Sequence, residues 1–197
     1  MWKFTFCPRF QFCSAIFFIC LIELAFFIAS LIHTCVTTGQ LDPHFFLGIN
    51  IFTLQKFGMR MPWLIYENGQ VHRFIVPTFL HFGFSHIVIT TLLQLSLGTV
   101  IESFMGTGRF IVYYTLVCIG SNIFGALCSS KYAIGSDPVI FGFLATLFSV
   151  MLVYWERIPG TNCTKVCQTL MMVMVFILVA MLLTTSAQQY SSYTSRV

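Results

Sequence analysis

The sequence predicts an all-α, polytopic membrane protein with about five transmembrane helices and a long first loop at the membrane interface. Of its 197 residues, 57% are hydrophobic and only 8% are charged, whereas a soluble domain usually has about a quarter charged residues. The mean hydropathy is +0.87. Five stretches reach or approach the roughly 20 apolar residues with which a helix crosses a bilayer. Lipid, unlike water, solvates this much apolar surface.

The predicted helices are apolar stretches that polar or turn residues separate. Asp137 and Pro138 open the fourth stretch, because aspartate is a good N-cap and proline is favoured at the first helical position. Glu156 and Arg157 close it. The five stretches cover roughly residues 12–33, 76–101, 109–129, 138–155 and 167–186.

The same stretches divide the chain into three parts. We expect an N-terminal segment over residues 1–11, a transmembrane domain over 12–186 and a polar C-terminal tail over 187–197. Inside the domain, the first loop over 34–75 carries many apolar residues, and a loop this apolar does not belong in free water. We therefore expect it to fold in the interface, with Trp63 at headgroup depth.

The distribution of charge excludes some partners and leaves the orientation open. The net charge of +4 contains no basic run, so we expect the lipid bilayer as a partner and no nucleic acid. Lysine and arginine divide evenly between the two predicted sides, so the positive-inside rule gives no orientation. We expect a multi-pass protein of the secretory pathway or the plasma membrane. Cys163 and Cys167 share a loop without a paired histidine, so we expect no metal site and no cofactor.

Five ionisable residues lie at predicted membrane depth, where charge is costly and a functional role is the first hypothesis. His81 and His86 stand five positions apart in one predicted helix, which turns them about 140° from each other. This is not the i, i+4 spacing of a metal-binding pair, so they either line a polar cavity or hydrogen-bond to a loop. The five residues are Glu23, His81, His86, Glu102 and Asp137.

Glu102 lies between Gly98 and Gly106, and Arg109 follows. The glycines allow two helices to approach closely. We expect Glu102 to brace its helix turn through Arg109 or through nearby backbone N–H groups, which is a structural role. Small residues at every fourth position indicate further helix–helix contacts; they are Ser121, Gly125 and Ser129, then, at similar spacing, Gly142, Ala145 and Ser149.

Several motifs follow one another along the chain at set distances. They read GQVHR at 69–73, VPTFLH at 76–81, FSH at 84–86, the glycine–glutamate–glycine pattern at 98–106, and GSDPVIFG at 135–142. In this order and spacing they resemble the rhomboid intramembrane serine proteases. The resemblance extends over about residues 46–155. It implies a rhomboid-like helical bundle and a scaffold for intramembrane proteolysis.

The resemblance also implies a register for the family's nucleophile. In rhomboids, a Gly-x-Ser motif at the start of the fourth helix supplies it, and a second glycine follows seven residues after the first. Gly135 and Gly142 reproduce that spacing, so the nucleophile position falls on Asp137 and not on Ser136. A register with Ser136 as nucleophile would break the spacing. We expect His81, Gly135 and Ser136 to line the cavity.

Other parts of the family's site are reduced as well. The family's base is a histidine on a sixth helix, and we expect it to be absent because the last histidine in this chain is His86. His86 falls on the family's oxyanion histidine, but the asparagine one turn later is Thr90, which leaves a degenerate oxyanion site. A Trp-Arg pair is reduced to His72-Arg73. We expect structural roles for Arg73, Gly98, Glu102, Gly106, Arg109 and Gly142.

Serine proteolysis needs an activated hydroxyl, a base and oxyanion donors, and an aspartate supplies no such hydroxyl. We expect His86 to pair with Asp137 in a closed, inactive site. The favoured function is a pseudoprotease that binds the transmembrane helices of client proteins. One alternative is an active rhomboid endopeptidase whose sixth helix is missing from this chain or supplied by another. A second is a small transporter or channel with a proton path.

Overall fold

The computed structural model forms two compact units, residues 1–140 and 141–197. In the part of the chain that the structure describes, regular structure is helical, and β-pairing is limited to two isolated bridges. The predicted N-terminal segment and C-terminal tail lie outside that part. The described residues are 14–42, 46–128, 132–157, 164–166, 168–170, 173–174 and 177.

Three helices of the first unit are long and apolar enough to cross a membrane: α1 (Ala15–Thr38), α4 (Phe84–Met105) and α5 (Thr107–Cys128). A fourth, α6 (Asp137–Val153), is apolar but shorter, and it runs from the first unit into the second. These helices match four of the five predicted ones and confirm the all-α fold class. Of the fifth, 167–186, only a few residues are described, and these are helical.

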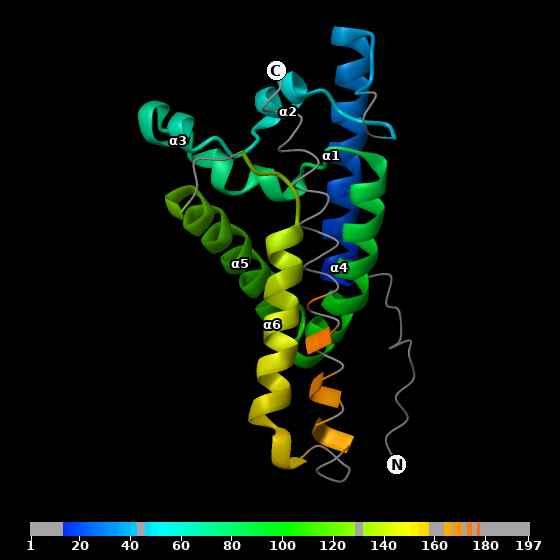
Figure 1. The fold of residues 1–197 in the computed structure, drawn as a ribbon, viewed down its shortest axis with the longest axis vertical. Helices are drawn as coiled ribbons and strands as arrows, with labels where there is room; N and C mark the ends of the chain where they lie inside the picture. The colour runs from blue at the N-terminus through cyan, green and yellow to red at the C-terminus, as the bar shows by residue number, and fades with distance from the viewer. Residues whose placement is uncertain are drawn as a thin grey trace. The chain divides into compact units, whose positions relative to one another are not determined.

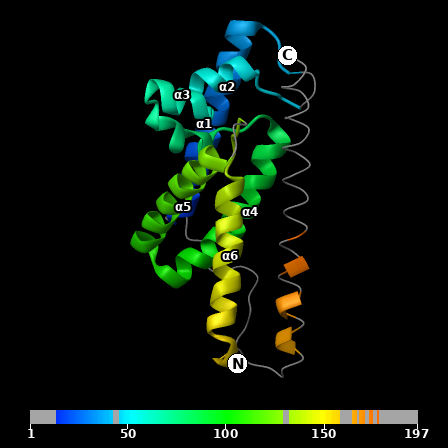
Figure 2. The ribbon, with the colours of Figure 1, turned by 60° about the vertical axis from the view of Figure 1, so that its left-hand side comes forward.

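The three long helices pack as a bundle in the first unit. α1 and α4 lie side by side along much of their length (Figures 1 and 2). α5 follows α4 after a tight turn in which Gly106, with φ +79°, ends α4. Because two turns reverse the chain, α1 and α5 end on the side of the bundle where α4 begins.

The first loop and the residues directly after it fold into four short helices at that same end of the bundle (Figures 1 and 2). Two are α-helical, α2 (Ile51–Phe57) and α3 (Pro62–Asn68). Two are 3₁₀ turns, η1 (Val71–Phe74) and η2 (Val76–Phe79). The loop is therefore a folded element, as its apolar composition predicted.

The second predicted helix begins later than expected. The expected start was residue 76, but η2 is a separate 3₁₀ turn and α4 begins at Phe84. Pro77 stands in the first turn of η2, where its missing N–H costs nothing. Gly83, with an extended backbone at φ −170°, then precedes α4. The prediction of one continuous helix was wrong, because an apolar run contains no signal for a break beyond its proline.

Arg73 holds the first loop together from inside. Its guanidinium donates from Nη1 to the Met59 carbonyl at 2.6 Å and from Nη2 to the Gln55 carbonyl at 3.1 Å. Its Nε donates to Gln70 Oε1 at 2.6 Å. Gln55 lies in the last turn of α2 and its carbonyl also accepts the Gly58 N–H, whereas Met59 follows the helix by two residues. Burial lowers the pKa of Arg73 from its usual value, yet an arginine stays charged in such a site. These contacts support the structural role expected of Arg73.

A second arginine of the loop, Arg60, lies against α5 at Gly125. A Cβ atom on Gly125 would overlap the guanidinium, with Arg60 Cζ only 2.7 Å away. Two backbone hydrogen bonds with Ala133, of 3.1 and 3.3 Å, hold this loop segment, and the Tyr66 hydroxyl reaches the Ala126 carbonyl at 3.4 Å. Gly125 therefore makes room for a loop side chain and not, as expected, for a neighbouring helix.

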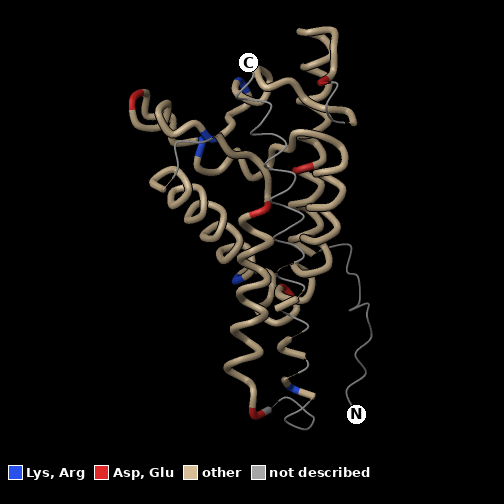
Figure 3. The backbone as a smooth tube through the Cα atoms, in the orientation of Figure 1, with Lys and Arg blue, Asp and Glu red and all other residues tan. Residues whose placement is uncertain are grey.

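The long helices turn apolar side chains outward and polar side chains inward. Charged residues are sparse along them (Figure 3). Phe18, Leu92 and Leu116 are more than half exposed. This arrangement fits a lipid solvent, in which exposed apolar surface costs little free energy and polar groups need partners inside the protein. The buried polar side chains of these helices are Glu23, Ser30, Thr34, His86, Thr90, Gln94, Glu102 and Asn122.

Candidate functional site

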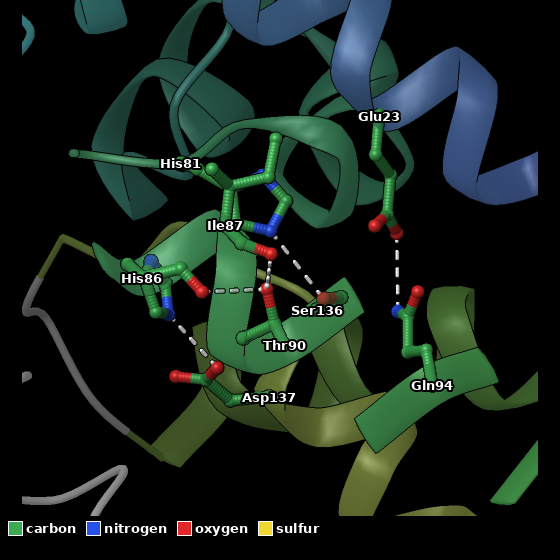
Figure 4. Close-up of polar contacts among 8 residues, drawn as sticks. All are labelled: Glu23, His81, His86, Ile87, Thr90, Gln94, Ser136 and Asp137. Atoms are coloured by element: carbon green, nitrogen blue, oxygen red, sulfur yellow. Dashed lines mark hydrogen bonds and ion pairs between the residues drawn. The ribbon is translucent and has the colours of Figure 1, made fainter. Parts of the chain in front are cut away.

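One face of α4 carries a buried residue at every fourth position, and most of these residues are polar. Positions four apart lie above one another on a helix and form a single row. Figure 4 shows three residues of this row together with the side chains that they face. The row makes the interior of the bundle polar along most of α4. Its members are His86, Thr90, Gln94, Gly98 and Glu102.

His86 and Asp137 form a hydrogen-bonded pair where α4 and α6 begin. His86 Nε2 lies 3.0 Å from Asp137 Oδ1 (Figure 4). An ionised carboxylate only accepts hydrogen bonds, so the ring nitrogen Nε2 is the donor. The side chain of His86 is 2% exposed and that of Asp137 is 19% exposed. The expected pairing of these two residues is therefore present.

Gly135 makes this close approach of His86 possible. Its φ is +108°, in the left-handed region that favours glycine. A Cβ atom there would lie 2.7 Å from His86 Cε1. The Gly135 N–H donates to the Pro77 carbonyl at 2.9 Å, which ties the segment before α6 to η2. Both the backbone and the available space therefore require glycine at this position.

His81 and Ser136 make a second contact beside the pair of His86 and Asp137. Ser136 Oγ and His81 Nε2 are 3.5 Å apart, and both residues are fully buried. The rings of His81 and His86 lie 5.1 Å from each other. The expectation that the two histidines turn away from each other on one helix was wrong. His81 precedes α4, which begins at Phe84, so helical geometry does not separate them.

The Thr90 hydroxyl is turned toward its own helix. It lies 2.8 Å from the His86 carbonyl and 3.2 Å from the Ile87 carbonyl (Figure 4). A hydroxyl has one proton to donate, and here that proton serves the backbone. In this conformation Thr90 offers no donor to the space beside His86.

Glu23 lies where α1, α4 and α5 meet. Its Oε1 accepts hydrogen bonds from Gln94 Nε2 at 3.0 Å and from the Tyr114 hydroxyl at 3.3 Å. Gln94 Oε1 in turn accepts from Cys20 Sγ at 3.7 Å. We predicted Glu23 as a candidate but not its partners. The signal that would have found Gln94 is its place midway between His86 and Glu102 on one helical row.

The Glu102 carboxylate caps the first turn of α1. It accepts the backbone N–H groups of Ala15 at 2.9 Å and Ile16 at 3.2 Å, and the Thr107 hydroxyl at 2.9 Å. The N-cap residue of α1 supplies no side-chain hydrogen bond of its own, so another helix provides the cap. The expected brace through backbone N–H groups is present, but in α1. Arg109 is exposed and makes no ion pair with Glu102 in the described part of the chain.

The glycines for which we expected structural roles occupy three different settings. Gly98 is buried in the row along α4. Gly106 has φ +79° and donates its N–H to the Glu102 carbonyl at 2.8 Å, which ends the helix. Gly142 lies inside α6, in the second unit.

Comparison with known proteins identifies one family. Residues 68–194, which are more than half of the chain, match a family model described as the rhomboid domain. The match includes His86, Asp137 and the whole row along α4. No solved structure matches the chain significantly.

Three relatives show how far the similarity extends. Rhomboid-like protease 2 of Toxoplasma gondii is 26% identical over 173 residues, covering 87% of this chain and 59% of the relative. Rhomboid protease GluP of Bacillus subtilis (strain 168) is 35% identical over 116 residues, covering 57% and 23%. Rhomboid-like protease 1 of Toxoplasma gondii is 30% identical over 154 residues, covering 76% and 49%. The chain thus spans between 23% and 59% of the length of these relatives.

Proposed function

This chain belongs to the rhomboid family, and we propose that it is a pseudoprotease that binds the transmembrane helices of client proteins without cleaving them. Its membrane character follows from the rhomboid domain and the long apolar helices. The observation that carries the proposal is Asp137, which stands where the family's motif places its nucleophile and which is paired with His86 at 3.0 Å.

The chemistry of a carboxylate at this position argues against proteolysis. Serine proteolysis needs a hydroxyl that an adjacent base can activate. A carboxylate that attacked an amide directly would have to form an anhydride, which is not a reasonable route. An aspartic-protease mechanism needs two carboxylates that share a proton. Among the described residues, the hydrogen-bond partner of Asp137 is an imidazole, that of His86, and not a second carboxylate.

The donors of the degenerate oxyanion site are also engaged. Proteases stabilise the developing oxyanion with donors that are free and correctly placed before the reaction. The Nε2 proton of His86 is directed at Asp137, and the Thr90 hydroxyl donates into its own helix. Each contact leaves one donor fewer for a substrate, which supports a closed site.

Client binding rests on the retained membrane scaffold. The outward faces of α1, α4 and α5 expose large apolar side chains. Helices within a bilayer associate by close packing and by hydrogen bonds between them. A surface of this kind suits another transmembrane helix as a partner.

The alternative function is an active serine endopeptidase, and two observations favour it. The three relatives named above are each called a protease. Ser136 also has its hydroxyl 3.5 Å from His81 Nε2, a serine beside an imidazole. Both groups are fully buried, so this arrangement would have to open before a substrate could reach it.

Reconstitution of the whole chain tests both functions together. We would place it in vesicles with a single-pass model substrate that carries a photocrosslinker in its transmembrane helix. The expected result is crosslinking to the substrate without cleavage. Cleavage by the unmodified chain would contradict the proposal, and so would the absence of any crosslink above that of an unrelated membrane protein.

Two variants make the result specific. Asp137→Ser restores a hydroxyl at the family's nucleophile position. Cleavage gained only by this variant would show that Asp137 prevents proteolysis by the unmodified chain. Ser136→Ala removes the neighbouring hydroxyl. Labelling of the unmodified chain by a fluorophosphonate probe, lost in Ser136→Ala, would establish the alternative function.

A further inference from the structure

The buried carboxyl of Glu23 has an asymmetric set of hydrogen bonds. Its Oε1 accepts two, from Gln94 Nε2 at 3.0 Å and from the Tyr114 hydroxyl at 3.3 Å. Its Oε2 is buried and has no hydrogen-bond partner. Glu23 itself is completely buried. Figure 4 shows the carboxyl facing the Gln94 amide from across the bundle.

This pattern is that of a carboxylic acid and not of a carboxylate. A carboxylate spreads its charge over two oxygens, and each needs donors when it is buried. In an acid, the carbonyl oxygen accepts the hydrogen bonds and the other oxygen carries the proton, and a buried hydroxyl without an acceptor costs less free energy than a buried charge without donors. Glu102 gives the comparison within the same bundle, since its two oxygens share three donors. Glu23 Oε2 has none.

In the part of the chain that the structure describes, no cation lies beside Glu23 to compensate a charge on it. Among the described residues, its hydrogen-bond partners on α4 and α5 are a neutral amide and a phenol. The titratable groups that face it are Cys20 on its own helix, Tyr114 and Cys118 on α5, and Asp137 at the start of α6. Each of these is neutral or negative, and an uncompensated charge at membrane depth is costly.

We propose that Glu23 is a proton-binding site: the folded bundle holds this carboxyl as a neutral acid with its proton on Oε2, and the packing of α1 against α4 and α5 depends on that proton. The Gln94 amide is oriented for this state, because its Nε2 donates to Glu23 while its Oε1 faces the Cys20 thiol. Loss of the proton leaves a negative charge without a cation between three helices. The site is independent of whether the chain cleaves or only binds substrates.

Infrared spectroscopy of the whole chain in a bilayer tests the protonation state directly. At neutral pH the exposed carboxyl groups are ionised, so a carbonyl band of a protonated acid reports a buried one. We expect such a band in the unmodified protein, shifted in heavy water and missing from Glu23→Gln. Its absence from the unmodified protein would overturn the proposal, whether or not the variant folds.

The pH dependence of unfolding tests the dependence of packing on the proton. The folded chain holds a proton that the unfolded chain releases, so stability falls as the pH rises. Between about pH 6 and pH 8, below the usual range of Cys, Tyr and Lys, we expect the unfolding temperature to fall by roughly 3–5 °C per pH unit from this site. Glu23→Gln is the matched control, since its amide oxygen accepts the same two hydrogen bonds and it has no proton to lose.

The expected result is a smaller pH slope in Glu23→Gln than in the unmodified chain. Equal slopes would overturn the dependence of packing on the proton, because the histidines and all other titratable groups are common to both proteins. Neither measurement uses a substrate, so failure here is distinguishable from failure of the proposed pseudoprotease function.

Discussion

At the scale of single residues, the buried polar groups near the starts of α4 and α6 each have a nearby partner. Asp137 accepts a hydrogen bond from His86, Thr90 donates to a backbone carbonyl, and Ser136 lies beside His81. Each pair satisfies polar groups that are otherwise costly to bury. The cluster therefore contributes to stability, and this contribution is measurable without knowledge of a substrate.

Removal of the Asp137 carboxylate should destabilise the protein more than its neutralisation does. Asp137→Ala leaves His86 Nε2 buried without an acceptor, at a cost of about 1–3 kcal/mol. Asp137→Asn retains an oxygen acceptor and should cost about 1 kcal/mol or less. Thermal unfolding of the two variants in the same detergent measures the difference. Equal losses of stability in the two variants would mean that the contact with His86 does not contribute to the stability of the folded state.

Gly135→Ala should be among the most damaging small substitutions in the chain. The new methyl group would lie 2.7 Å from His86 Cε1, on a backbone with φ +108°. Strain of this kind costs on the order of 1–3 kcal/mol, and displacement of the imidazole adds the loss of its hydrogen bond with Asp137. Gly39→Ala is the control, because Gly39 has φ +66° but nothing within 4 Å of a Cβ. A loss no larger than that of the control would show that the contact with His86 is not close.

At the scale of elements, two helix ends are stabilised by distant segments, whereas Asn50 caps the start of α2 locally. The carboxylate of Glu102, at the end of α4, caps α1, and Arg73 from η1 binds the Gln55 carbonyl in the last turn of α2 and the Met59 carbonyl just after that helix. Helix termini leave backbone groups without partners, and in lipid those groups have no water to bind. The structural roles of Glu102 and Arg73 stay predictions. Their partners could not be predicted, because a cap supplied from a distant segment leaves no local pattern in the sequence.

Glu102→Ala should loosen the first turn of α1. The backbone N–H groups of Ala15 and Ile16 lose their acceptor, and a charged cap of this kind is worth about 1–2 kcal/mol. Hydrogen exchange should rise at the start of α1 and remain unchanged in the middle of α5. Glu67→Ala, which removes an exposed carboxyl from α3, serves as the control. Unchanged protection at Ala15 would contradict the capping role.

Gly125 and Arg60 should behave as a coupled pair. Gly125→Ala alone places a methyl group where the guanidinium lies, and Arg60→Ala should restore the space. A double-mutant cycle with unfolding as the readout should give a coupling of about 0.5–3 kcal/mol. Gly120→Ala on the same helix has nothing within 4 Å of its Cβ and should be neutral or slightly stabilising. If the effects of the two substitutions on the free energy of unfolding were additive, Arg60 and Gly125 would not be in contact.

At the scale of the whole molecule, hydropathy predicted the helices, and the family's motif predicted the positions near the site. The all-α class, four of the helices, the folded first loop and the pairing of His86 with Asp137 were all expected. The break between η2 and α4 was not, and it changes the site because it brings His81 beside His86. A polar row along α4 also escaped prediction. Four-residue spacing is visible in the sequence, but which of its members are buried depends on how three helices pack.

The threading of the chain through the membrane gives a final prediction. α1 and α5 both end at the side of the bundle where the first loop folds: Thr34 near the end of α1 bonds to Thr53 of α2, and Gly125 near the end of α5 meets Arg60. Cys35 and Cys128 are exposed at these two ends. If α1, α4 and α5 each cross the bilayer, the two cysteines lie on the same side.

Single-cysteine versions that retain Cys35 or Cys128 test this in sealed vesicles. A membrane-impermeant maleimide added outside should label both versions or neither, and permeabilisation should then label whichever was protected. A cysteine-free version gives the background. If one version is labelled from outside and the other only after permeabilisation, residues 35 and 128 lie on opposite sides of the membrane. An odd number of crossings would then separate them, and the three-helix bundle could not span the membrane as described. The same experiment fixes the orientation, which the even division of lysine and arginine leaves undetermined.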